Sequence, residues 1–209
     1  MFNRVLCSLI GSFLVSIGIS IIVMLNYGMP SFDTFVLVIS KLLSIEYTTS
    51  LRVTQFIIFI VLLWLKKYFN IKFNELLLSV ISVIVVTLFI DFVSIYAKII
   101  FEKNLMSFVI GFILYSYGIT LLVQPNLFLA PNDKLLNEIS FKTTHTYAFY
   151  KVAGDILLLI ISLIVIWNMN YNISVSFVSI FLTFFTGIFV GIFSKMNRTL
   201  LKKFKLFLK

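Results

Sequence analysis

Residues 11–23 read GSFLVSIGISIIV, and residues 111–123 read GFILYSYGITLLV. At a shift of 100 residues, 6 of these 13 positions are identical, and the identities include Gly11 with Gly111 and Gly18 with Gly118. Matches of Leu, Ile and Val arise readily by chance in so apolar a chain, whereas two matched glycines do not, because the chain has only 8. The stretch therefore predicts an internal repeat.

The repeat extends into the segments that follow these helices. Three polar pairs keep the shift of 100: Asn26 with Asn126, Asp33 with Asp133, and Ser40 with Ser140. Pro30 and Pro131 lie one residue out of step, which predicts one inserted residue in the turn. In agreement with an insertion, RVTQFIIFI (52–60) matches KVAGDILLL (151–159) at a shift of 99 and pairs Arg52 with Lys151. Each unit is predicted to be a helix, a Pro/Asp turn, a short helix and two further helices.

The composition is typical of a polytopic membrane protein. Of the 209 residues, 61% are hydrophobic and 12% are charged, against about half and about a quarter in soluble domains. A disordered chain is also excluded, because disorder requires low hydrophobicity. A bilayer core about 30 Å thick needs about 20 apolar residues per helix. Six runs qualify: 5–25, 51–69, 74–97, 105–124, 149–167 and 173–194. Two apolar pieces, 34–43 and 134–139, are too short to span and are predicted to be half-helices or re-entrant segments.

Three spans per unit is an odd number, so the second unit must cross the membrane in the opposite sense. We therefore predict an all-α membrane protein of six transmembrane helices, built as a 3+3 inverted-topology repeat with short broken or re-entrant helices after the first and fourth spans. The first repeat is residues 1–103 and the second is residues 104–194, followed by a basic tail over 195–209. Inverted repeats with broken segments in matching positions are typical of secondary transporters. The ends of half-helices offer partial charges and unpaired backbone groups to a ligand.

Basic residues predict which side of the membrane each segment faces. With both termini in the cytoplasm, the inner side holds 13 bases and the outer side holds 4, so the positive-inside rule favours this orientation. The outer bases are Lys41, Arg52, Lys98 and Lys103, and the inner ones are Arg4, Lys66, Lys67, Lys72, Lys134, Lys142, Lys151 and six in the tail. The tail also has an apolar helical face made of Leu200, Leu201, Phe204, Phe207 and Leu208. This pattern predicts a helix that lies on anionic lipids of the inner leaflet, with docking onto a partner as the alternative.

Other functions are disfavoured by what the chain carries. The net charge is +9, but the bases do not form a basic face with interleaved aromatics, which disfavours nucleic acid as a partner. A single cysteine, Cys7, excludes an intramolecular disulfide and a cysteine-based metal cluster. His145 is the single histidine and is predicted to be a solvated loop residue. No HExxH, GxSxG, Walker or CxxC motif occurs, so we predict no enzyme, no metal site and no cofactor.

The two turns resemble those of a known family. A glycine-rich first helix with Gly28–Met29–Pro30–Ser31–Phe32–Asp33, and a second turn Ala130–Pro131–Asn132–Asp133, resemble the bacterial YczE/YyaS/YitT family of integral membrane proteins. The resemblance covers residues 8–160 or thereabouts. That family commonly carries Trp where this chain has Phe32, and its Gly/Thr-rich last helix is matched here by Thr183, Thr186, Gly187 and Gly191 alone. The resemblance implies a multi-pass protein of a bacterial plasma membrane and no settled biochemical activity.

Asp33 and Asp133 are the leading candidates for a binding site, with Pro30 and Pro131 marking the helix breaks. Each aspartate follows a proline and begins a short apolar segment. One interpretation is an N-cap, in which the carboxylate accepts backbone N–H groups and stabilises the helix by about 1 kcal/mol. The other is a carboxylate that binds a cation or a proton at a broken helix.

Arg52 and Lys151 lie 19 and 18 residues after the aspartate of their own repeat, which favours one internal ion pair per repeat. The alternative is that each base snorkels to an interface from the start of its helix. The ion-pair interpretation predicts that neutralising Asp33 alone is more damaging than replacing Asp33 and Arg52 together.

Two further aspartates lie within predicted spans. An aspartate at the centre of a span costs about 2.5–3.5 kcal/mol on the insertion scale, so Asp91 is predicted to lie near the outer interface or to face a polar path inside the bundle. Asp155 follows Lys151 by four residues and is predicted to pair with it across one helical turn. Two G-x6-G stripes predict close packing of the first and fourth spans: Gly11 with Gly18, and Gly111 with Gly118.

Together these features favour a small carrier or exporter of a small molecule, with the bound species between the two halves near the Pro/Asp breaks. Two alternatives stay open. One is a non-transporting accessory or regulatory protein that binds a partner complex. The other is the substrate-capture subunit of an ATP-driven importer, although an inverted repeat argues against it. The predicted partners are the lipid bilayer and a small-molecule substrate, and a homodimer or a membrane-protein partner is left open.

Overall fold

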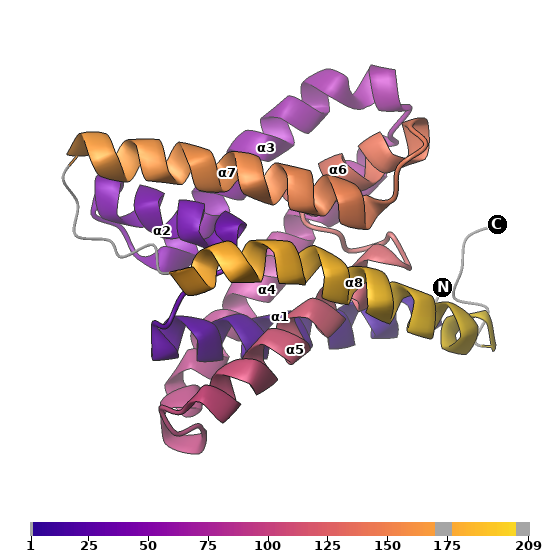
Figure 1. The fold of residues 1–209 in the computed structure, drawn as a ribbon. Helices are drawn as coiled ribbons and strands as arrows, with labels where there is room; N and C mark the ends of the chain where they lie inside the picture. Colours follow the sequence, from indigo (N-terminus) through magenta and orange to yellow (C-terminus); the bar gives the residue numbers. More distant parts are fainter. Residues whose placement is uncertain (1, 170–176, 204–209) are drawn as a thin grey trace.

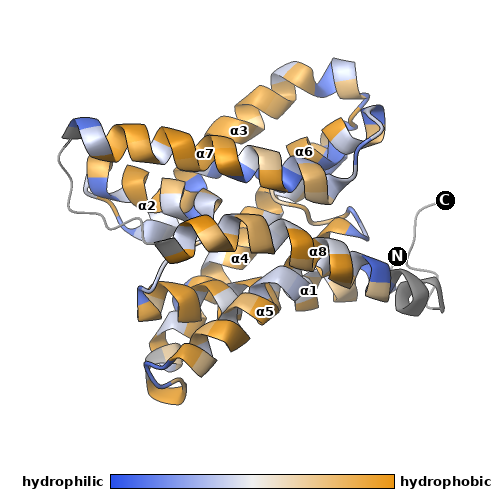
Figure 2. Cartoon of the chain, viewed as in Figure 1, coloured by the Kyte–Doolittle hydropathy of each residue, from blue (hydrophilic) through white to orange (hydrophobic). Residues whose placement is uncertain are grey.

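The computed structural model describes residues 2–169 and 177–203, and every regular element in that part of the chain is a helix. In chain order the helices are α1 (Phe2–Leu25), α2 (Ser31–Leu43), α3 (Tyr47–Phe69), α4 (Phe73–Ile100), α5 (Leu105–Val123), α6 (Pro131–Lys142), α7 (Tyr147–Met169) and α8 (Phe177–Lys203). Within the described residues, 6 helices are long and apolar enough to cross a membrane, namely all but α2 and α6. Figure 2 shows apolar residues along these long helices and hydrophilic residues where α3 meets α4 and where α4 meets α5. The predicted fold class, an all-α membrane protein with six spans, is confirmed.

Helices α1 to α4 recur as α5 to α8, displaced by 100 residues (Figure 1). The order of buried and exposed side chains over residues 81–90 of α4 is the same at nine of ten positions over residues 181–190 of α8. After α1 and α5, Asn26 and Asn126 both adopt a left-handed backbone conformation, with φ of 53° and 49°. The chain therefore folds as two halves whose helices are equivalent pair by pair.

The shift of 99 predicted for the third helix of each repeat is wrong. Tyr47 donates a hydrogen bond to Asp33, and Tyr147 donates the equivalent bond to Asp133. Because both tyrosines keep the displacement of the aspartates, the shift of 100 continues through α3 and α7.

The two prolines differ by substitution within a turn of constant length. Pro30 is the N-cap of α2, whereas Pro131 is the first residue of α6. No residue is inserted, so the predicted equivalence of Arg52 with Lys151 does not hold. The equivalent pairs are Lys151 with Leu51, and Arg52 with Val152.

Helices α1 and α5 cross with their backbones in contact. A Cβ atom on Gly18 would lie 2.5 Å from the carbonyl oxygen of Gly111, and one on Gly118 would lie 2.8 Å from the carbonyl oxygen of Gly11. The later glycine of α1 meets the earlier glycine of α5, so the two helices run antiparallel. An antiparallel crossing of equivalent helices is what an inverted-topology repeat requires.

Helices α2 and α6 are half-helices whose first turns meet inside the molecule. They have 13 and 12 residues, a length of about 20 Å that is shorter than a bilayer core. The first turn of α2 contacts Tyr115 at the middle of α5, and the first turn of α6 contacts Gln55 in α3. In Figure 1, α2 lies toward the left of this centre and α6 toward the right, the side on which α1 begins and α8 ends.

The predicted tail begins as part of the last long helix. Helix α8 runs without a break past residue 195 to Lys203. The side chains of residues 198–203 and the whole of residues 204–209 lie outside the described part of the chain. The lipid-binding face of the tail therefore stays a prediction.

Two of the bases assigned to the cytoplasmic side lie inside the protein. Lys134 and Lys151 are each 2% exposed. Without them, 13 − 2 = 11 bases are predicted on the inner side against 4 on the outer side. The positive-inside rule still favours the same orientation, which stays a prediction.

Candidate functional site

The aspartates of the two half-helices face the interior of the protein. Asp33 and Asp133 are the third residues of α2 and α6, and the N-cap positions belong to other residues, so the predicted N-cap role is wrong. Each carboxylate accepts a hydrogen bond from a tyrosine fourteen residues later: Tyr47 to Asp33 Oδ1 at 2.6 Å and Tyr147 to Asp133 Oδ1 at 2.7 Å. Tyr115 of α5 donates a further bond to Asp33 Oδ2 at 2.9 Å. Both carboxylates also lie at the positive ends of their helix dipoles.

Lys151 of α7 bridges two of the aspartates. Its ammonium lies 3.4 Å from Asp133 Oδ1 and 3.4 Å from Oδ1 of Asp155, one turn further along the same helix. The side chains of Lys151 and Asp155 are 2% and 1% exposed. Neither oxygen of Asp155 has a hydrogen-bond partner within the described residues. A buried carboxylate without hydrogen bonds is destabilising unless a cation or a proton compensates its charge.

The first half carries no charge at the two equivalent positions. Leu51 is equivalent to Lys151, and Gln55 is equivalent to Asp155. Gln55 is buried, and its Oε1 accepts a hydrogen bond from the backbone N–H of Asn132 at 3.0 Å. A neutral amide therefore satisfies a free N–H at the start of α6, and the ion pair belongs to the second half alone.

A cavity of about 60 Å³ lies between the two half-helices. Its polar wall is formed by Asp33, Tyr47, Asp133 and Lys151, with Tyr115, Gln55 and Asn132, and the rest of the wall is apolar. One water molecule needs about 15 Å³ by this measure, so the cavity has room for about four waters or for an ion and its partners. A large organic ligand does not fit in this state of the protein.

The charges of the cavity wall, taken together with Asp155, which lies outside that wall and pairs with Lys151, do not balance. With all groups ionised, three aspartates and one lysine sum to −2. The N-terminal ends of two half-helices contribute about +0.5 each. About one positive charge is therefore missing, and uncompensated charge in a low-dielectric interior is strongly unfavourable. No group of three His, Cys, Asp or Glu side chains in the described part of the chain is placed to hold a metal ion. A deficit of about one positive charge would be matched by a proton or by a monovalent cation.

Arg52 does not pair with Asp33, contrary to the predicted ion pair in each repeat. Its guanidinium binds Asp91 of α4 at 2.9 Å and the hydroxyl of Thr87 at 3.0 Å. The Arg52 and Asp91 side chains are 43% and 47% exposed, so the pair lies at the surface of the protein, along the edge of the α3–α4 contact. The predicted polar path through Asp91 is therefore not present, and Asp91 serves to hold α3 against α4.

A second charged cluster surrounds Lys134 of α6. Its ammonium lies 2.8 Å from Glu138, 3.1 Å from Glu75 of α4 and 3.3 Å from Asn126 Oδ1. Lys134 is thus satisfied by its neighbours, and it ties α6 to α4 and to the turn after α5.

Sequence reasoning missed the tyrosines and the glutamine of the site. Tyr47 and Tyr147 match at the same shift of 100 as the aspartates, so extending that register by seven residues beyond Ser40 would have found them. Gln55 matches Asp155 at the same shift. Tyr115 has no such signal, because α5 approaches Asp33 only in the folded protein.

Comparison with known proteins yields one family. A family model described as "Family of unknown function (DUF6198)" matches residues 2–195 of the chain. No curated protein matches the chain. No solved structure matches it either.

Proposed function

Since the chain belongs to this family, whose function is unknown, we propose a function from the site itself: a small secondary carrier or exporter. In this proposal a small molecule and one compensating positive charge bind between the two half-helices. The observation that carries the proposal is the group of Asp33, Asp133 and Lys151 in the wall of a cavity, with buried Asp155 paired to Lys151 behind that wall. The proposed location is a bacterial plasma membrane, with both termini in the cytoplasm.

The unbalanced charge is the argument for transport over a purely structural role. A structural network is expected to match each buried charge with a partner, because an unmatched one destabilises the fold. Here the missing charge leaves room for a proton or a monovalent cation to enter and leave. Ionisable residues inside a membrane protein commonly mark such pathways. The first half supports this argument, since Leu51 and Gln55 satisfy the same fold without an ion pair.

The variant that tests this proposal is Asp155→Asn. It removes one negative charge, so the ionised cluster and the two helix ends sum to about zero. The variant is expected to fold, because the carboxylate it replaces makes no hydrogen bond in the described part of the chain. It is also expected to lose the need for an added positive charge.

The test uses the purified protein reconstituted in vesicles on a solid-supported membrane. The vesicles are challenged with amino acids, monoamines, carboxylic acids and sugars, each with and without a proton or a sodium gradient. A carrier gives a transient current with at least one solute class, and that current depends on one of the two gradients. In Asp155→Asn the gradient dependence is lost.

A second measurement needs no knowledge of the solute. The melting temperature of the wild-type protein in detergent is expected to rise with sodium, relative to choline at equal ionic strength, or to rise as the pH falls from neutral. Asp155→Asn is expected to lose that response. A melting temperature that changes with neither sodium nor pH, together with no transient current for any solute, would exclude the carrier proposal. A protein partner that co-purifies in a fixed ratio with both wild type and Asp155→Asn would then favour the accessory role.

A further inference from the structure

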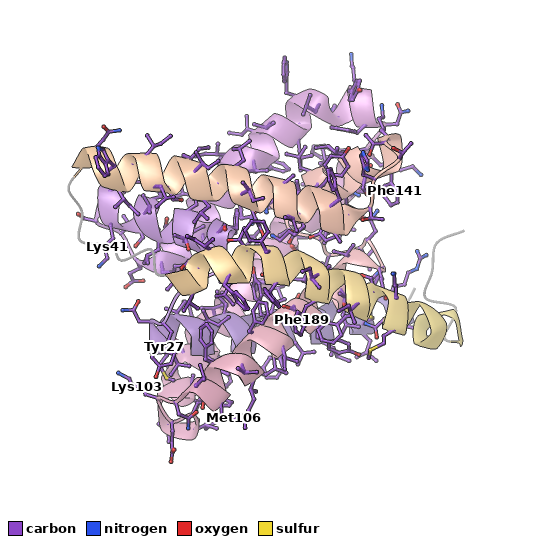
Figure 3. All side chains as sticks on the ribbon, in the orientation of Figure 1. Tyr27, Lys41, Lys103, Met106, Phe141 and Phe189 are labelled. Atoms are coloured by element: carbon purple, nitrogen blue, oxygen red, sulfur yellow. The ribbon has the colours of Figure 1, made fainter. Side chains whose placement is uncertain are left out.

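A large cleft lies beside the central cavity in the second half of the protein. It has a volume of about 870 Å³ and is formed by the C-terminal parts of α5, α6 and α8 and the start of α7. Phe141 and His145 in its wall are exposed, and Figure 3 shows Phe141 at one end of the molecule. Asn137 Nδ2 and Gln124 Oε1, which belong to two lining residues, are buried without hydrogen-bond partners within the described residues.

Tyr147 lies between this cleft and the central cavity. It forms part of the wall of the cleft. Its hydroxyl donates the 2.7 Å hydrogen bond to Asp133, which lines the cavity. Tyr147 therefore connects the wall of the cleft to a carboxylate of the cavity. The equivalent residue of the first half, Tyr47, lines the cavity and makes the same kind of bond to Asp33.

The two halves differ at the helix contact beside this route. In the first half, Arg52 of α3 is bound to Thr87 and Asp91 of α4. The equivalent residues of the second half are Val152, Gly187 and Gly191, and all three line the cleft. Val152 packs directly on Gly187, with no side chain able to form an ion pair. The α3–α4 contact is thus held by charge, whereas the α7–α8 contact rests on small apolar groups.

We propose that the cleft is the access route from one side of the membrane to the central cavity, and that the Tyr147 side chain is its gate. In the first half, Arg52, Thr87 and Asp91 keep the equivalent route closed. This inference rests on the proposed carrier function and deepens it by naming the route and the gating residues. The closed route lies at the opposite end of the molecule, where Figure 3 shows Tyr27 beside Lys103. Opening it requires breaking the Arg52–Asp91 pair.

The test measures from which side a small cation reaches the cavity. Cys7, the single native cysteine, is replaced in Cys7→Ser, and Ala130→Cys places a thiol in the cavity wall. Silver ions are added to one side of sealed membrane vesicles, and the remaining thiol is counted with a fluorescent maleimide after denaturation. Two single-cysteine variants at exposed loops, Lys72→Cys and Lys103→Cys, define the two sides. The loop with Lys72 lies at the cleft end, because Lys142 of α6 binds the carbonyl of Tyr68 there.

The structure predicts that Ala130→Cys reacts from the Lys72 side. Adding Tyr147→Ala is expected to speed that reaction about tenfold or more, because the variant removes the gating side chain and its hydrogen bond to the Asp133 carboxylate. Tyr150→Ala is the matched control, since Tyr150 lies on the same helix but lines neither the cleft nor the cavity, and it is expected to leave the rate from this side unchanged. Should Tyr147→Ala fail to fold, Tyr147→Phe replaces it, with a smaller acceleration expected.

The second arm tests the closed route. Arg52→Val with Asp91→Gly gives the first half the residues of the second, and it is expected to make Ala130→Cys reactive from the Lys103 side as well. Equal effects of Tyr147→Ala and Tyr150→Ala, or no reaction from the Lys103 side in the double variant, would overturn the proposed route. Transport currents with unchanged silver access would remove the route and keep the carrier. Silver access as predicted, without currents for any solute, would exclude the carrier function and keep the access route.

Discussion

Lys151 and Leu51 occupy equivalent positions in α7 and α3, and both are buried, with 2% and 7% of their surface exposed. One half of the protein thus shows how the fold is satisfied at this position without a charge. Gln55, one turn after Leu51, does the same for the position of Asp155. The fold therefore does not require the Lys151–Asp155 ion pair of the second half. A buried charge that the fold does not require is a candidate for function.

Removing Lys151 alone is expected to be far more damaging than removing its pair. Lys151→Leu leaves Asp133 and Asp155 buried without their counter-charge, which is expected to lower the free energy of unfolding by about 3–5 kcal/mol. Lys151→Leu with Asp155→Gln reproduces the residues of the first half and is expected to recover at least half of that loss. Denaturant unfolding in detergent measures both variants. Additive losses in the double variant would show that Lys151 and Asp155 do not act as a pair.

The tyrosine–aspartate bonds are expected to contribute equally in the two halves. Tyr47→Phe and Tyr147→Phe each remove a hydrogen bond to a carboxylate, with an expected loss of about 1.5–3 kcal/mol. The control is Tyr68→Phe, because the Tyr68 side chain is exposed, and its effect is expected to stay within about 0.5 kcal/mol. Thermal unfolding of the three variants in one detergent compares them. A loss at one bond without a loss at the other would contradict the equivalence of the two half-helices.

The glycine crossing of α1 and α5 is expected to tolerate no side chain. In Gly18→Ala the new Cβ would lie 2.5 Å from a backbone oxygen of the other helix, and the overpacking is expected to cost about 1–3 kcal/mol or more. Gly191→Ala is the matched control. Its Cβ would lie at an ordinary 3.7 Å from the Cβ of Ala148, and the higher helix propensity of Ala favours the change by up to about 1 kcal/mol. Gly18→Ala is therefore expected to lower the melting temperature, and Gly191→Ala is expected to raise it.

The partner of Arg52 is tested by two mutant cycles. Arg52→Met with Asp91→Asn is expected to show a coupling of about 0.2–1 kcal/mol, since the pair is about half exposed. Arg52→Met with Asp33→Asn is expected to be additive, because no contact joins Arg52 to Asp33. Coupling in the second cycle in place of the first would restore the ion pair predicted from spacing.

The orientation of the chain is expected to follow the positive-inside rule. In intact cells, Lys103→Cys in the Cys7→Ser background is expected to react with an impermeant maleimide, whereas Lys72→Cys is expected to react only after the membrane is opened. The reverse pattern would place the termini outside and would also exchange the sides of the proposed access route.

How far the sequence predicts this protein depends on whether a feature is local. The apolar runs predicted all six spans within a few residues, and the Pro/Asp turns predicted both half-helices. The pairing of Lys151 with Asp155 was also predictable, since residues four apart share one face of a helix. The pairing of Arg52 was not. One residue of misalignment, from 100 to 99, turns a side chain by about 100° around its helix, which separates the interior from the surface.

The number of spans, their repetition in two halves and the broken helices all follow from the amino-acid sequence, because hydrophobic length, periodicity and turn residues act along the chain. The tertiary structure alone decided which side chains meet between the halves. Tyr115 reaches Asp33 only because Gly18 and Gly111 let α5 press against α1. Likewise, Gln55 meets the start of α6, and Lys134 meets Glu75, through the packing of helices that are distant in sequence. Such contacts depend on how each helix is rotated about its axis, and that rotation is set by packing against all of its neighbours.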